Sequence, residues 1–193
     1  KLNINVKPNF LLMKKLIYSL SLLLISQFGF GQAVKDNAVI PVSITLNSIL
    51  RLTVTSGGNI QFVVNTIDQY TGGIANSDQY TTKFIVSSSR DFDVTMGAED
   101  VDFVGQETGG TMALAFLRYT MSDPGATGAT LSAAQTELTD LSAPVTIVSN
   151  TAGGQLEYDI QWELGTDANN TLLDANLPAD IYITNVFLNL APQ

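Results

Sequence analysis

The chain of 193 residues contains no cysteine and no histidine. Without cysteine it forms neither a disulfide nor a lipid-modified N-terminal cysteine, so an exported domain must rely on core packing or subunit contacts. Nucleophilic catalysis by a cysteine, or by a serine with a histidine base, is also excluded. No Gly-x-Ser-x-Gly elbow appears among its many serines.

Basic residues are the second scarcity. Charged residues make up 14% of the chain, with 9 Lys+Arg against 18 Asp+Glu, where about 25% charged is usual. Four of the basic residues precede residue 32 and all the acidic ones follow it, so residues 32–193 carry a net charge of −13. A surface this acidic repels phosphate backbones and anionic lipid, which excludes nucleic acid as a partner.

The N-terminal part has the pattern of an export signal. Met13-Lys14-Lys15 supplies a start and a positive region, Leu16 to Ile25 is a short apolar run, and Gly29-Phe30-Gly31 offers small residues for cleavage. We expect residues 1–12 to be upstream read-through, and cleavage after Gly31 to leave Gln32 as the mature N terminus.

The apolar run is about half the length of a membrane span, which needs about 20 residues. The mature protein is therefore expected to have no span, and to be extracellular or at the cell surface after passing the periplasm. The alternative is that the run is a helix that stays uncleaved.

Alternation with period two dominates the rest of the chain. In Gln155 to Leu164, five apolar side chains alternate with five polar ones, as in a half-buried antiparallel strand. Further strands are expected in the segments 38–46, 50–55, 60–65, 80–86, 90–96, 112–121, 144–148 and 181–190.

Turn residues separate these segments. Ser56-Gly57-Gly58-Asn59 predicts a tight hairpin, and glycine pairs at 72–73, 109–110 and 153–154 predict other turns. Ser122 to Ala143 predicts a long connection with a short helical turn near 133–138. Strands spaced about eight to twelve residues apart predict an all-β fold, a single antiparallel β-sandwich over residues 32–193.

Clustered carboxylates are the only groups typical of acid–base chemistry. Asp91 and Asp93, and Glu157, Asp159 and Glu163, each lie on the polar side of an expected strand. Strand alternation alone explains this spacing. We therefore expect solvated charge and no enzyme activity.

Two acidic loops could supply oxygen ligands to Ca²⁺, namely Glu99-Asp100-Val101-Asp102 and Asp167-Ala168-Asn169-Asn170. Neither follows the EF-hand pattern. We expect no cofactor, with calcium in a loop as the lesser alternative.

Aromatic residues raise the alternative of a glycan-binding surface. Trp162 alternates in phase with apolar neighbours, which predicts a core position. Tyr70, Tyr80, Tyr119 and Phe103 would have to lie together on one exposed face to form a binding platform.

The two ends of residues 32–193 carry a family resemblance. Ala38-Val-Ile-Pro-Val-Ser-Ile-Thr-Leu46 alternates cleanly, and Leu177-Pro-Ala-Asp-Ile-Tyr-Ile-Thr-Asn-Val-Phe-Leu-Asn-Leu190 closes the domain. This resembles bacterial pilin-like and spore-coat-protein-U-like β-sandwiches over about a quarter of the chain. It departs from them by lacking a cysteine pair and by having Asp180 where glycine is common.

The resemblance implies an Ig-like or pilin-like sandwich assembled by β-strand addition. The donor would be residues 39–46, inserting Val42, Ile44 and Leu46 into a neighbouring copy. The acceptor would be the last strand, with Ile181, Ile183, Val186, Leu188 and Leu190. The alternative is that residues 39–46 are the first strand of their own domain, and Pro41 suits either reading.

The function expected from the sequence is thus a non-catalytic structural subunit of the cell surface or the extracellular space. It would associate with itself into filaments, or with other surface proteins. A secreted module that binds glycans or another surface is the alternative.

Export predicts a defined new N terminus. N-terminal sequencing of the exported protein should begin at Gln32, because the small residues at Gly29 and Gly31 suit a signal peptidase. Recovery of a product that still carries Met13 would contradict the prediction of a cleaved signal.

Overall fold

The computed structural model describes residues 10–25 and 40–193. It divides into two units, residues 1–45 and residues 46–193. In the first, α1 (Phe10–Ile25) covers the apolar run of the expected signal. No described helix is long and apolar enough to cross a membrane. The expected cleavage site between Gly31 and Gln32 lies outside the described residues.

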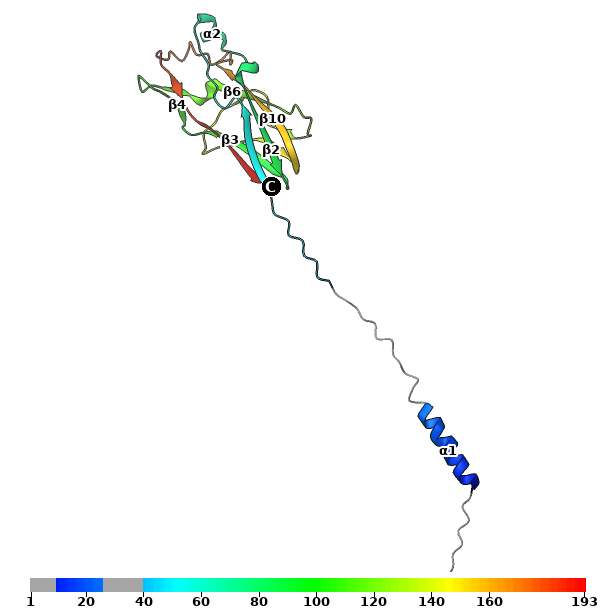
Figure 1. Cartoon of the computed structure of the whole chain (residues 1–193). Helices are drawn as coiled ribbons and strands as arrows, with labels where there is room; N and C mark the ends of the chain where they lie inside the picture. The colour runs from blue at the N-terminus through cyan, green and yellow to red at the C-terminus, as the bar shows by residue number, and fades with distance from the viewer. Residues whose placement is uncertain (1–9, 26–39) are drawn as a thin grey trace, which may run out of the picture. The chain divides into compact units, whose positions relative to one another are not determined.

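The second unit, called the β-domain here (residues 46–193), contains three antiparallel sheets (Figure 1). The first has the order β1 (Leu50–Ser56), β2 (Thr81–Ser88), β10 (Gly153–Leu164), β6 (Leu117–Ser122), β8 (Thr136–Glu137). The second has the order β12 (Val186–Pro192), β3 (Phe92–Ala98), β9 (Val145–Asn150), β7 (Thr130–Leu131). The smallest has the order β11 (Tyr182–Ile183), β4 (Asp102–Gly105), β5 (Thr111–Ala113).

One hydrophobic core receives side chains from both larger sheets. Its fully buried members come from β2, β3, β6, β9 and β10; buried side chains alternate along most of β2, β3, β6 and β10, whereas in β9 the two successive residues Ile147 and Val148 are buried. The largest of them are Tyr119, Tyr158, Phe84, Phe92, Met96, Ile147, Ile160, Val86, Val94 and Val148. The expected all-β fold is therefore confirmed, and the alternation that predicted it marks the core.

Aromatic pairs tie the strands of the first sheet together. The rings of Phe84 and Tyr158 lie 5.5 Å apart, and Tyr119 meets Trp162 edge-on at 5.9 Å. Trp162 is buried, as predicted, and its indole Nε1 donates to Thr82 Oγ1 over 2.9 Å. A buried indole N–H needs such a partner, because an unpaired polar group is costly in a core.

The segment after β1 differs from the prediction. Residues 60–65 form no strand, and the expected hairpin at 56–59 is wrong, because β1 pairs with β2. Gly57 has a φ of 66° and lies against the start of β2, where a Cβ would overlap the Thr81 carbonyl. Thr82 Oγ1 donates to Gly57 O over 2.6 Å, which holds the turn after β1 against the start of β2.

The short helix α2 (Ile67–Gly72) follows, and sequence reasoning missed it. Thr66 caps it: Gln69 N donates to Thr66 Oγ1, and Thr66 N donates to Gln69 Oε1. This reciprocal capping box was readable as Thr-x-x-Gln.

Two further segments are divided where one element was expected. Residues 112–121 contain the end of β5, a single 3₁₀ turn at Leu114–Phe116, and β6. The long connection 122–143 includes β7 and β8, so the expected helical turn near 133–138 is wrong.

The expected last strand, 181–190, is also two strands in different sheets. β11 pairs with β4, whereas β12 pairs with β3. Between them Asn185 O accepts from Glu99 N over 2.8 Å, at the point where the chain leaves β4 and begins to pair with β3. The apolar phase shifts from odd to even numbers at this point, so the signal was present in the sequence.

A core substitution should unfold this domain readily. Phe84 has no exposed surface, so Phe84→Ala should lower the free energy of unfolding by about 3–5 kcal/mol through lost burial and a cavity. Urea denaturation followed by circular dichroism measures this. Val63 is 51% exposed, and Val63→Ala should change stability by less than about 0.5 kcal/mol. Equal losses would contradict the assigned core.

Candidate assembly surface

The described part of the expected donor segment exposes its apolar side chains. Ile40, Val42, Ile44 and Leu46 have exposed fractions of 80%, 80%, 81% and 91%. Residues 40–49 belong to no strand, and β1 is the first strand of the β-domain. Val39 lies outside the described residues. Exposed apolar side chains at alternate positions are what a segment that pairs with a sheet edge must offer.

Two neighbouring strands of the β-domain, one in each large sheet, have an edge that pairs with no other strand. β1 is the outermost strand of its sheet, and β12 is the outermost strand of the other large sheet. Their Cα atoms approach within 8 Å, yet no ladder pairs them. Free N–H and C=O groups on such edges are available to another strand.

The side chains along these edges are incompletely covered. Leu52 of β1, and Val186, Leu188 and Leu190 of β12, touch the core but remain half-buried. Leu50 and Val54 of β1 are 36% and 43% exposed. The core side chains are therefore less well covered along this side than in β2 and β3, whose inward side chains are buried.

The five expected acceptor residues do not share one surface. Val186, Leu188 and Leu190 line the β12 edge, where they half-cover the core. Ile181 and Ile183 are 62% and 49% exposed, and Ile183 is in β11. The structure thus brings together three of the five, because of the break at 184–185.

Asp180 holds the turn that leads into β11. Its carboxylate accepts from Glu107 N over 2.9 Å, from Thr108 N over 2.8 Å, and from Thr108 Oγ1 over 2.6 Å. The bond from the Thr108 hydroxyl is the largest cause that lowers the pKa of Asp180 below its ordinary value of 3.8. This role explains an aspartate where the resemblance expects glycine, and the sequence alone did not show it.

The carboxylates on the expected polar faces have separate roles. Asp93 accepts from Ser149 Oγ and from Gln193 Nε2, the Ser149 bond being the main cause that lowers its pKa. Asp159 lies 3.6 Å from Lys83, and Glu157 is exposed. Glu163 was expected in solvent, but it is 5% exposed.

Glu163 is buried beside an arginine with which it does not pair, and its Oε1 has no hydrogen-bond partner within the described residues. It faces Arg118 across the ladder between β10 and β6. Arg118 bonds instead to Glu137 at 3.0 Å and Asp167 at 2.7 Å, and the Glu137 bond is the main cause that raises the pKa of Arg118. The alternation along its own strand did not reveal the burial of Glu163.

The two acidic loops show no converging ligands. Asp167 is engaged with Arg118 and with Asn169 N. Glu99 accepts from Asn185 Nδ2 over 2.6 Å. Within residues 10–25 and 40–193, no three carboxylates approach closely enough to hold a metal ion.

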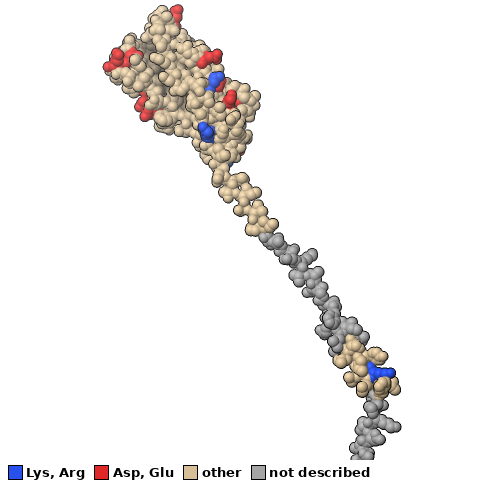
Figure 2. Space-filling view, viewed as in Figure 1, with Lys and Arg blue, Asp and Glu red and all other residues tan. Residues whose placement is uncertain are grey.

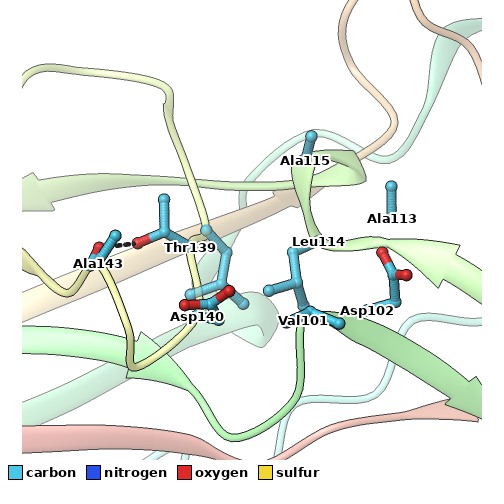
Figure 3. Close-up of a pocket in the computed structure, with 9 residues that line it drawn as sticks. Val101, Asp102, Ala113, Leu114, Ala115, Thr139, Asp140 and Ala143 are labelled. Carbon is cyan, nitrogen blue, oxygen red and sulfur yellow. Dashed lines mark hydrogen bonds between the residues drawn. The ribbon is translucent and has the colours of Figure 1, made fainter.

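A shallow cavity of about 350 Å³ lies beside the first of these loops, residues 99–102 (Figure 3). It is formed by Val101, Asp102, Ala113, Leu114, Ala115, Leu138, Thr139, Asp140 and Ala143. Figure 3 shows Leu114 and Val101 between the carboxylates of Asp140 and Asp102. Its floor is apolar, and its lining includes the carboxylates of Asp102 and Asp140, of which Asp140 accepts through Oδ1 from Ser142.

The four candidate aromatics do not form a platform. Tyr119 and Phe103 are 0% and 9% exposed. Burial raises the pKa of the Tyr119 hydroxyl. Tyr80 is half-buried and stacks on Phe62 with ring centroids 4.3 Å apart, and Tyr70 packs against the core.

Compared with protein-family models and with curated proteins, the chain matches none. The candidate surface therefore rests on geometry alone.

The Asp180 turn should make stability depend on pH. A lowered pKa in the folded state means a contribution that is complete above the unfolded value and is lost as pH falls through the folded value. Asp180→Asn should lower the urea midpoint at neutral pH and flatten its decline below about pH 4. Urea titrations at several pH values measure both effects. Glu157→Gln, at an exposed carboxylate, should change neither.

Proposed function

We propose that this protein is a non-catalytic structural subunit, exported to the cell surface or the extracellular space, that associates with itself by β-strand addition. The observation that carries the proposal is the exposure of four apolar side chains at alternate positions, Ile40, Val42, Ile44 and Leu46, together with the unpaired edges of β1 and β12. A segment suited to act as donor and an edge suited to accept it thus occur on one chain.

Strand addition would satisfy two kinds of group along these edges, namely the unpaired main-chain N–H and C=O groups and the half-buried apolar side chains. Main-chain groups of residues 40–46 would pair with an edge, and three apolar side chains would cover the half-buried residues of β12. Burying each such side chain contributes about 1.5–3 kcal/mol. Part of this is offset by the loss of freedom on association, so only several side chains acting together suffice.

The edges of β1 and β12 lie too close together to admit a strand between them unless one of them moves. A strand that pairs on both sides holds its neighbours about 9–10 Å apart, whereas β1 and β12 approach within 8 Å. Insertion between them therefore requires the edges to separate where they lie closest. β1 is the element that would yield, because six of its seven residues are exposed.

The remaining features of the proposal agree with this reading. The two large sheets share one core, as the sheets of an Ig-like or pilin-like sandwich do. The helix α1 coincides with the apolar run of the expected signal peptide. A glycan-binding role has less support, because two of its four candidate aromatics are buried.

The donor segment can be tested without shortening the chain. Val42→Asn combined with Ile44→Asn should abolish self-association, because amides replace the inserting apolar side chains. The full-length sequence is expressed, and the exported product is compared with the wild type by sedimentation velocity and electron microscopy.

The matched control changes the alternate positions of the same segment. Ser43→Asn combined with Thr45→Asn introduces the same two amides on the other side, and association should persist. If the two double variants behave alike, strand addition through these residues is wrong. A wild-type product that stays monomeric at every concentration would remove the proposed function itself.

A further inference from the structure

Basic residues are distributed very unevenly along the chain. Arg118 is the last of them, and residues 119–193 contain none. Within residues 46–193 there are four: Arg51, Lys83, Arg90 and Arg118. Lys83 pairs with Asp159, and Arg118 pairs with Glu137 and Asp167. Arg51 and Arg90 are exposed, and neither has an ion-pair partner in the described part of the chain.

These two arginines lie at the same end of the β-domain, called the arginine end here. β1 begins where β2 ends, since Leu50 pairs with Ser88 and Ser89 N donates to Ile49 O over 2.9 Å. Arg90 follows in the turn from β2 to β3. In Figure 1 this is the end where β1 begins and where the C terminus lies.

The carboxylates beside Arg90 already have partners. Asp91 Oδ1 accepts from Ala152 N over 3.3 Å. Asp93 accepts from Ser149 and Gln193. The guanidinium of Arg90, like that of Arg51, is therefore left to meet a negative partner.

The opposite end of β3 has the complementary character. β3 has seven residues, a length of about 20 Å, and beyond it come Glu99, Asp100 and Asp102. Ala98 N donates to Thr139 O, and Leu141 N donates to Ala98 O, which brings Asp140 to the same place. This is called the acidic end here, and residues 91–117 contain no lysine or arginine.

The cavity of about 350 Å³ lies at the acidic end. Val101 at its rim is 72% exposed, and Leu141 nearby is 39% exposed. Its apolar floor between two carboxylates suits a group with an aliphatic stem and a cationic tip, as an arginine has (Figure 3). Elsewhere, Figure 2 shows carboxylates scattered over the visible face with few basic groups among them.

We propose that the arginine end of one copy docks on the acidic end of the next, with Arg90 entering the cavity between Asp102 and Asp140. The occupant is a second copy because both complementary features occur on one chain, about one strand length apart. Such a head-to-tail contact repeats without closing on itself and produces a linear chain. The inference rests on the proposed self-association and adds its direction.

The two contacts would reinforce each other. Residues 46–49 lead out of the arginine end, where Ile49 bonds to Ser89. A donor segment leaving this end enters the copy whose acidic end is docked there. Exposed charge pairs contribute little to affinity but help to orient two partners. The arginine contact would therefore align the two copies, while the donor segment would bury the apolar surface that holds them together.

Charge reversal tests the contact in the exported full-length product. Arg90→Glu should weaken association about tenfold at low ionic strength, because an attraction in solvent becomes a repulsion. Asp102→Arg should do the same, and combining the two should restore most of the loss. Sedimentation velocity at low and high salt measures this, and the effects should shrink as salt rises.

Matched controls separate this contact from net charge. Lys83→Glu makes the same change in net charge as Arg90→Glu but lies within β2. Glu157→Arg makes the same change as Asp102→Arg at an exposed position of β10. Each control should alter the association constant less than about twofold. If the end variants act like the controls, or the double variant is not restored, the end-to-end contact is wrong. Association that then still depends on Val42 and Ile44 leaves the proposed function standing. Absence of any wild-type association overturns both.

Discussion

The β-domain depends on the packing of two sheets against each other through a single core. Inward side chains of β2, β10 and β6 meet those of β3 and β9, and Tyr119, Tyr158 and Phe84 are completely enclosed. Because the chain has no cysteine, no covalent link supplements this contact. The strands at the centre of each sheet are consequently the most buried, and the outermost strands β1 and β12 are the least.

Alternation alone was enough to predict the all-β fold, the central strands and the burial of Trp162. It failed where a neighbour overrides local pattern. Residues 60–65 alternate like a strand but form none, since β1 bonds to β2 and not to the segment that directly follows it. Glu163 was expected in solvent, yet it is 5% exposed, which the alternation along its own strand does not reveal. The Asp180 turn depends on residues 107 and 108, more than 70 positions away, and no local signal reveals such a partner.

Alternation along the chain also predicted part of the candidate assembly surface. The donor residues Val42, Ile44 and Leu46 stand out by alternation, and their exposure agrees with that reading. The acceptor was predicted as one strand, whereas the chain changes sheets at Asn185. The division of charge between the two ends of β3 required knowing that residues 139–141 join the end of that strand.

The single tryptophan gives this fold a built-in optical reporter. Trp162 is 5% exposed, its N–H is satisfied by Thr82, and Tyr119 lies against its ring. An indole in such dry surroundings emits at short wavelength and shifts to the red only when water reaches the core. Its emission therefore follows unfolding of the core. Unfolding of the β-domain can thus be observed through the native chain, with no added label.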